Sequence, residues 1–123
     1  MERSTAQRRA ILKVIEEAGR PVGPGEIFEA ARVLVPGLGI ATVYRAIKQL
    51  IEGGHLAQVD LPGEPPRYEA AGKAHHHHFR CSLCRRVFEL DRCGDSFQQF
   101  APKGFHLDGH ELYLFGRCRE CTA

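Results

Sequence analysis

Apolar residues in the first half of the chain recur every three or four positions, which is the spacing of amphipathic helices. Glycine or proline closes each of the three stripes, so the pattern predicts helices at about residues 4–18, 24–34 and 40–52. Ser4 and Gln7 fit a capping box at the start of the first helix. The first half of the chain is therefore expected to be mainly helical.

Two short strand-like runs follow these helices, at residues 55–60 and 67–70. Proline and glycine between the runs force a turn and exclude long strands, so the runs predict a two-stranded hairpin. Three helices with a short connection between the second and the third, followed by a hairpin, form a winged helix-turn-helix domain. In such a domain the third helix enters the major groove of DNA.

The polar outer face of the third predicted helix has a composition that favours DNA binding. Periodicity alone does not decide this, because any three-helix domain has a polar face. Small side chains allow close approach to a base, and longer ones offer hydrogen-bond donors or an apolar ring. The expected contacts on this helix are Ala41, Thr42, Tyr44, Arg45 and Lys48. On the first helix, Arg8 and Lys13 are expected to contact phosphates.

The overall composition is that of an ordinary globular protein and changes this picture little. A formal charge of +2 at pH 7 is too small to indicate a nucleic-acid partner by itself. No apolar run approaches the roughly 20 residues of a transmembrane helix, and the first residues lack the apolar segment of a secretory signal. We therefore expect a cytoplasmic protein with no membrane partner.

All five cysteines lie in the second half of the chain, a pattern that favours metal ligation over disulfides. Two C-x-x-C pairs, Cys81 with Cys84 and Cys118 with Cys121, have the spacing that lets two thiolates reach one tetrahedral ion. We interpret them as a structural Zn²⁺ site that stabilises a piece with too little core of its own. Unrelated buried or redox cysteines are the alternative. The remaining Cys93 is expected to be a buried apolar residue, with a ligand or redox role as its alternative.

A run of four histidines leads directly into the first cysteine pair. On an extended strand His76 and His78 face one side while His75 and His77 face the other, so one strand can serve two metal sites. An engineered tract, or a solvent-exposed tract with incidental metal affinity, are the alternatives.

Taken together, these strings resemble those of a known family. HHHHFRCSLCRRVFEL and then GFHLDGHELYLFGRC-x-x-C, after a helix with GIATVYRAIKQL, are similar to sequences of the ferric uptake regulator (Fur) family of metal-dependent repressors. The resemblance implies an α+β fold, with a winged-helix DNA-binding domain and hinge at 1–71 and a small α/β zinc-containing dimerisation domain at 72–123. It further implies a homodimer that binds AT-rich inverted repeats of double-stranded DNA when a sensing metal is loaded. Tyr44 and Arg45 match the helix-three residues that the family uses on DNA.

The resemblance also implies a regulatory metal site in the hinge, at His76, His78 and Glu69. Iron-type and peroxide-sensing members usually have a histidine at the start of helix two, where this chain has Pro21. We expect Asp60 to complete the site. Two nitrogen and two oxygen ligands suit tetrahedral Zn²⁺ better than the five or six ligands of an iron or manganese site. The pattern is similar to that of zinc uptake regulators, although the same ligand types accept Fe²⁺ or Mn²⁺.

An additional metal site in the dimerisation domain is implied at His75, His77 and His110. The family usually supplies a glutamate there, about where this chain has Ser96. Asp95 would therefore have to reach in from the neighbouring position.

The sequence thus predicts a metal-responsive DNA-binding repressor that senses zinc. Sensing of iron, manganese or peroxide within the same family is one alternative, and a constitutive zinc-ribbon DNA-binding protein is the other. An enzyme is not expected, because a four-sulfur site leaves no open coordination position and the H-x-E with P-C-x-x-C signature of zinc deaminases is missing. No small-molecule substrate is expected either.

Overall fold

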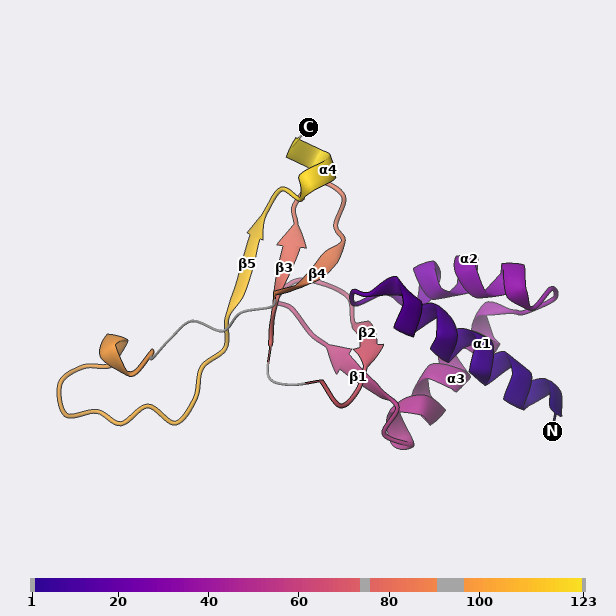
Figure 1. Ribbon diagram of the computed structural model, residues 1–123, viewed down its shortest axis with the longest axis horizontal. Helices are drawn as coiled ribbons and strands as arrows, with labels where there is room; N and C mark the ends of the chain where they lie inside the picture. Colours follow the sequence, from indigo (N-terminus) through magenta and orange to yellow (C-terminus); the bar gives the residue numbers. More distant parts are fainter. Residues whose placement is uncertain (1, 74–75, 91–96, 123) are drawn as a thin grey trace. The chain divides into compact units, whose positions relative to one another are not determined.

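The computed structural model describes residues 2–73, 76–90 and 97–122. The chain divides into two compact units, Met1–Lys73 and Ala74–Ala123, which are described in turn (Figure 1). The predictions for His75, Cys93 and Asp95 fall outside the described residues.

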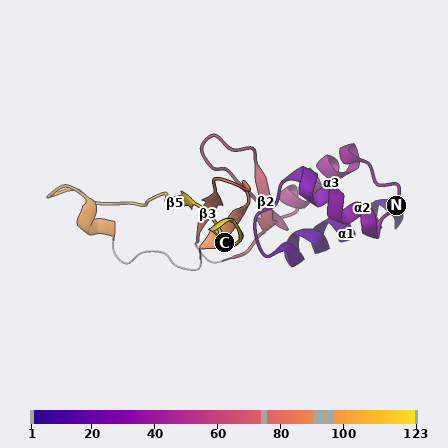
Figure 2. The same cartoon turned by 90° about the horizontal axis from the view of Figure 1, so that it is seen from above.

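Three helices build the first unit: α1 (Glu2–Ala18), α2 (Pro24–Leu34) and α3 (Ile40–Glu52). The second and third have the predicted bounds. The first begins before Ser4, so Ser4 and Gln7 lie inside the helix and do not cap it. A carboxylate cap forms at α2 instead, where Glu26 accepts a hydrogen bond of 3.3 Å from the backbone N–H of Gly23. Figure 2 shows the three helices gathered into one bundle.

The apolar stripes of these helices meet in a single core. Ile11 of α1, Ile27 of α2 and Val43 of α3 are fully buried within it. Burying an aliphatic side chain of this size stabilises a fold by about 1.5–3 kcal/mol, so the stripes that predicted the helices also hold them together. The polar face of α3 is consequently left on the outside.

A short hairpin completes the first unit. It consists of β1 (Leu56–Val59) and β2 (Arg67–Ala70), which pair antiparallel. Tyr68 of β2 exchanges two backbone hydrogen bonds with Val22, of 2.8 and 2.9 Å, and this bridge ties the hairpin to the segment between α1 and α2. The side chains of Val22 and Tyr68 are both buried in the helical core. The hairpin, which is the wing of the winged helix, is therefore an integral part of the unit.

The second unit is a small sheet with the strand order β4-β3-β5. The central strand β3 (His77–Cys81) pairs antiparallel with β4 (Val87–Leu90) and parallel with β5 (Tyr113–Gly116). A 3₁₀ turn, η1 (Phe97–Phe100), and a single helical turn, α4 (Arg119–Thr122), complete it. Among the described residues of this unit, the buried apolar ones are Cys81, Val87 and Cys118. Two of these three are cysteines, so the unit has little core besides its sulfur cluster.

The edge strand β5 exposes large apolar side chains. Leu114 is 46% exposed and Phe115 is 64% exposed. An edge strand of this kind is a surface on which a second chain can pair. In the described ranges, no helix has the length and apolar character needed to cross a membrane.

Candidate functional site

The four paired cysteines converge at one end of the sheet in the second unit. Cys81 ends β3 and Cys84 lies in the turn toward β4, while Cys118 and Cys121 belong to the α4 segment (Figure 1). One sulfur atom from each lies within 4.8 Å of the others, and the sulfurs of Cys84 and Cys118 are 3.8 Å apart. Tetrahedral Zn²⁺ with bonds of about 2.3 Å places its sulfur ligands about 3.8 Å from one another. The cluster therefore fits one tetrahedral zinc ion.

Backbone hydrogen bonds shape the turn that carries the first pair. The N–H of Arg85 donates to the carbonyl of Cys81 at 3.0 Å, and the N–H of Cys81 donates to the carbonyl of Arg86 at 2.9 Å. Closing this turn puts Arg85 at a φ of 67°, the left-handed region that costs a non-glycine residue about 1–2 kcal/mol. This tight turn brings the sulfurs of Cys81 and Cys84 into the same cluster.

Hydrogen bonds to sulfur favour the thiolate form of the first pair. The N–H groups of Cys84 and Cys118 both donate to the Cys81 sulfur at 3.4 Å, and with the Cys84 donor first among the causes they lower the pKa of Cys81 from 9.0 to about 5. The Arg86 Nε donates to the Cys84 sulfur at 3.2 Å and lowers the pKa of that thiol.

The opposite shift occurs at Cys121. Sharing a hydrogen with the Cys118 sulfur is the first cause that raises the pKa of Cys121, to about 12. Sulfurs this close cannot all carry negative charge unless a cation lies between them. A divalent cation meets this requirement, so the donor set supports metal binding.

The histidines of the β3 segment separate into two groups. The rings of His76 and His78 stand edge to face, with centroids 4.8 Å apart. His77 is buried, and its Nε2 lies 3.0 Å from the Nε2 of His110. The ring of His110 also packs on Phe97, with centroids 4.2 Å apart. Alternate histidines thus have different surroundings.

Glu89 is a candidate ligand that the sequence did not suggest. The β3–β4 register places it directly opposite His78, and its Oε1 lies 3.5 Å from the Nε2 of His76. The available signal was the strand-like run VFEL that follows the first cysteine pair. A hairpin folded about that pair brings the run back alongside the histidines.

The two carboxylates predicted for the regulatory site belong to the first unit. Glu69 is on β2. Asp60 follows β1 and accepts hydrogen bonds of 2.9 and 3.2 Å from the side-chain amide of Gln58. Asp60 therefore already has a donor, and its role as a ligand stays a prediction.

The predicted DNA-contacting residues gather on the outer faces of α3 and α1. Tyr44 is 56% exposed, and Arg45 donates a hydrogen bond of 3.0 Å to the hydroxyl of Thr42. Ala41 and Lys48 are exposed on the same helix. Lys13 of α1 is also exposed and forms an ion pair of 3.9 Å with Glu17. An exposed pair of this kind contributes little to stability, so Lys13 can exchange Glu17 for another anion.

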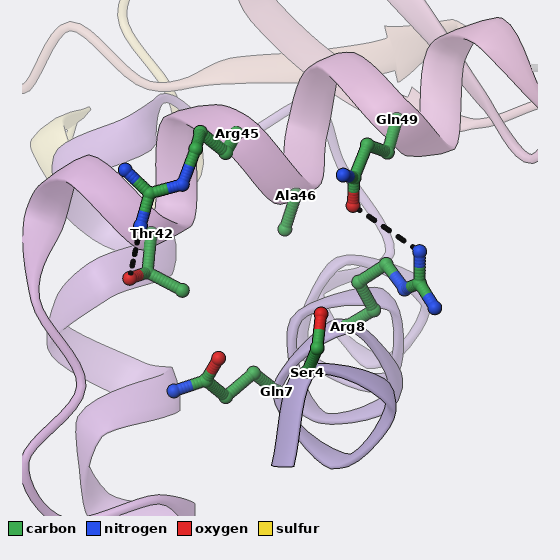
Figure 3. A pocket seen from close by; sticks show the side chains of 7 residues that line it. All are labelled: Ser4, Gln7, Arg8, Thr42, Arg45, Ala46 and Gln49. Atoms are coloured by element: carbon green, nitrogen blue, oxygen red, sulfur yellow. Dashed lines mark hydrogen bonds between the residues drawn. The ribbon is translucent and has the colours of Figure 1, made fainter. Parts of the chain in front are cut away.

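A polar pocket opens between α1 and α3 (Figure 3). Its lining residues are Ser4, Gln7, Arg8, Thr42, Arg45, Ala46 and Gln49. Two of them are arginines and none is acidic, so the pocket is positive and rich in donors. These properties suit an oxyanion such as a phosphate.

Comparison with known proteins now decides the family. Residues 2–115 match the model of the ferric uptake regulator family. The chain belongs to this family. The ferric uptake regulation protein of Campylobacter jejuni is 31% identical over 123 residues, which cover 96% of this chain and 78% of that protein. The protein of the same name from Escherichia coli K12 is 30% identical over 120 residues, which cover 94% and 81%.

Solved structures agree with this assignment. A zinc-bound manganese uptake regulator superposes with a TM-score of 0.78 at 26% identity, covering 91% of this chain and 87% of that one. FurB from M. tuberculosis, a zinc uptake regulator, superposes with a TM-score of 0.54 at 26% identity, covering 97% and 95%. The predicted α+β fold, a winged-helix domain followed by a small dimerisation domain with a cysteine cluster, is confirmed.

Membership in the Fur family carries functional conclusions. Its proteins are metal-responsive, DNA-binding transcription regulators that act as dimers, and they are not enzymes. The predicted repressor class is confirmed at this level. The relatives and solved structures include iron, manganese, zinc and peroxide regulators, so they do not single out the zinc subgroup.

Proposed function

We propose that this protein is a zinc-responsive repressor that binds AT-rich inverted repeats as a dimer when a hinge metal site is loaded. The observation that carries the proposal is the close pairing of His76 and His78, whose ring centroids are 4.8 Å apart, with Glu89 beside them. His76 and His78 stand at the start of the second unit, just after the boundary with the winged helix, and Glu89 lies opposite His78 on β4. A ligand set in this position can couple metal binding to the relative placement of the two domains.

The ligands that we propose for the regulatory site are His76, His78, Glu69 and Glu89. Glu89 is preferred to Asp60 because it already lies 3.5 Å from His76, whereas Asp60 is engaged by Gln58. The set has two imidazoles and two carboxylates, a number that suits tetrahedral zinc. The position where iron-type members usually carry a histidine is here occupied by Pro21, which is fully buried in the first unit. A third imidazole is therefore not supplied from the start of α2.

The proposed mechanism is a clamp across the hinge. His78 and Glu89 belong to the sheet of the second unit and His76 directly precedes its strand β3, whereas Glu69 is on strand β2 of the first unit. A bound ion would supply one positive centre that all four ligands share. Because the open arrangement loses the ligand from one side, the ligands favour a single closed arrangement. A change from mostly open to mostly closed requires a difference of up to about 5.5 kcal/mol.

Closure matters because the two winged helices of a dimer must reach successive major grooves, about 34 Å apart. In each half, Tyr44 and Arg45 are proposed to contact bases, with Ala41, Thr42 and Lys48 beside them. The pocket of Figure 3, with Arg8 at its edge, is proposed to hold one backbone phosphate, and Lys13 a second.

Two further metal sites belong to the proposal. The four cysteines are proposed to hold structural Zn²⁺, on the support of the 3.8 Å separation between Cys84 and Cys118. His77 and His110 are proposed to bind an additional ion together with His75 and Asp95. Their Nε2 separation of 3.0 Å is a few tenths of an ångström short of the roughly 3.3 Å expected for two ligands of one tetrahedral zinc.

The experiment that tests the function is a titration of DNA binding at controlled free metal. The dimer, with its cysteine-bound zinc retained, is added to a labelled AT-rich inverted-repeat duplex, and fluorescence anisotropy is recorded while free Zn²⁺, Fe²⁺ or Mn²⁺ is raised in separate series. Binding that appears at trace free zinc, and not at comparable iron or manganese, supports a zinc-responsive repressor. Binding that ignores every metal would instead identify a constitutive zinc-ribbon DNA-binding protein.

A further inference from the structure

One arginine connects the two cysteine pairs of the sulfur cluster. The Nε of Arg86 donates a hydrogen bond of 3.2 Å to the sulfur of Cys84, in the first pair. Its Nη2 donates a hydrogen bond of 2.7 Å to Glu120, which lies between the two cysteines of the second pair. A single guanidinium therefore contacts both halves of the site.

We propose that Arg86 is a positioning residue of the four-cysteine site, which holds the second cysteine pair against the first and slows the loss of the metal. The inference rests on the proposed zinc at the four cysteines and is independent of the regulatory site in the hinge. It concerns how long the metal stays bound, whereas the proposed function concerns how DNA binding is controlled.

The chemistry of the cluster explains why a cation is useful there. Four thiolates around one divalent ion carry a net charge of −2, and a positive donor on sulfur offsets part of it. A thiolate that accepts such a hydrogen bond is a weaker base and a weaker nucleophile. Cys84 is therefore harder to displace from the metal while Arg86 remains in place.

The second cysteine pair needs the tether because its own segment is short. The α4 helix is a single turn, Arg119–Thr122, and none of its described residues is buried. One turn is too short to be stable by itself in water. The ion pair from Arg86 to Glu120 is thus a direct connection between this turn and the β3–β4 hairpin, in addition to any metal.

The side chain of Arg86 is held in place by contacts besides the ion pair to Glu120. Its guanidinium lies over the ring of Phe88, 5.7 Å from the ring centroid. Exposed ion pairs usually contribute little, because holding two long side chains in one geometry costs entropy. Here the ring and the Cys84 sulfur already fix the guanidinium, so less entropy remains to be lost when Glu120 binds.

The chain offers a matched control in Arg119. It stands next to Cys118 and carries the same charge, yet its side chain makes no hydrogen bond or ion pair within the described residues. Removing Arg119 changes the local charge by the same amount as removing Arg86 but leaves the hydrogen bonds of Arg86 to Cys84 and Glu120 intact. Any effect specific to Arg86 must then come from its contacts.

The test measures zinc release from wild type, Arg86→Ala, Arg86→Lys, Glu120→Gln and Arg119→Ala. Metal analysis of the purified proteins comes first, and a wild type without zinc would overturn the zinc proposal and this inference with it. An excess of a chromogenic chelator is then added, and the release rate is followed by absorbance.

We expect release from Arg86→Ala to be faster than wild type by about tenfold or more, the range seen when a group that orients a metal ligand is lost. The release rates of Glu120→Gln and Arg86→Lys should fall between those of wild type and Arg86→Ala, because each variant keeps only part of the Arg86 contacts. The release rate of Arg119→Ala should match that of wild type. Equal rates for wild type and Arg86→Ala would overturn the inference. If Arg86→Ala cannot be purified in folded form, wild-type rates in both Glu120→Gln and Arg86→Lys would overturn it equally.

Discussion

The Nη1 of Arg8 on α1 lies 3.2 Å from the side-chain carbonyl oxygen of Gln49 on α3 and donates a hydrogen bond to it. This bond joins the first helix to the helix that is expected to enter the major groove, at the edge of the positive pocket in Figure 3. The hydrogen bond holds the Arg8 charge beside α3, so the base contacts and phosphate contacts that we propose would lie on one surface.

Replacing Arg8 by Ala should weaken DNA binding by a similar factor for every sequence. The reason is that a phosphate contact carries no base information, and its loss reduces the slope of log affinity against log salt by about 1. Titrations at several salt concentrations, on the AT-rich inverted repeat (the operator) and on a scrambled duplex, measure both the affinity and its salt dependence. Gln49→Ala is the control that removes the hydrogen bond but keeps the charge, and it should leave the slope unchanged. A loss confined to the operator would contradict a phosphate role.

Arg45→Ala should instead reduce discrimination between sequences. An arginine that contacts a base edge contributes about 1–3 kcal/mol of preference for the correct base. The measurement compares affinities for the operator and for single-base variants of each half-site, before and after the substitution. If every duplex is weakened equally, Arg45 contacts phosphate and the base contacts belong to its neighbours.

Glu89→Gln should raise the free zinc needed for DNA binding by at least about tenfold, since even groups that only orient a metal ligand have effects of this size. Asp60→Asn is the matched comparison, because it makes the same chemical change on a carboxylate that Gln58 already engages. We expect Asp60→Asn to respond to zinc as wild type does. The reverse order of the two variants would return Asp60 to the ligand set and remove Glu89 from it.

Removal of the metal that we propose at the four cysteines should unfold the second unit and spare the first. In the described part of the second unit, Val87 is the one aliphatic side chain that is fully buried. The first unit, by contrast, has a complete helical core. A structural metal supplies much of the folding free energy in such small units. Strong chelation should therefore abolish the dimer in gel filtration while the helical circular dichroism largely remains. Retention of the dimer without metal would show that the sheet is stable by itself.

High pH should destabilise the winged helix through Tyr68. Burial, with smaller effects of Tyr44 and Asp60, raises the pKa of its hydroxyl above the ordinary value of 10.0. The neutral form is therefore favoured in the folded state, and this stabilisation is complete below pH 10 and is lost as the pH rises through the folded pKa. Denaturant midpoints of wild type and Tyr68→Phe between pH 9 and about 11.5 test this. Wild type should lose more stability than Tyr68→Phe, and equal losses would contradict the account.

Much of the first unit could be predicted because its limits are local. Pro24 and Gly53 mark the ends of helices directly in the sequence, and the observed bounds of α2 and α3 agree with them. The prediction for the start of α1 was wrong because Ser4 and Gln7 fit a helix cap as well as they fit a helix interior. The cysteine pairs were recognisable from spacing, because both ligands of each pair lie within one turn.

Contacts that depend on strand register could not be predicted in the same way. Glu89 reaches His76 only through the pairing of β3 with β4, and a shift of one residue would put it on the other face. Arg86 reaches Glu120 across 34 positions of sequence. Such relationships exist only after the sheet has formed, and no local pattern signals them.

The most direct test of the hinge mechanism is the metal dependence of DNA binding in a His76→Ala, His78→Ala double variant. The variant leaves the four cysteines in place, so metal analysis can verify that the structural zinc is retained. We predict that wild type binds its inverted repeat only above a threshold of free zinc, and that the double variant stays unbound throughout the same titration. A double variant that still binds its operator only when metal is added would contradict the hinge site.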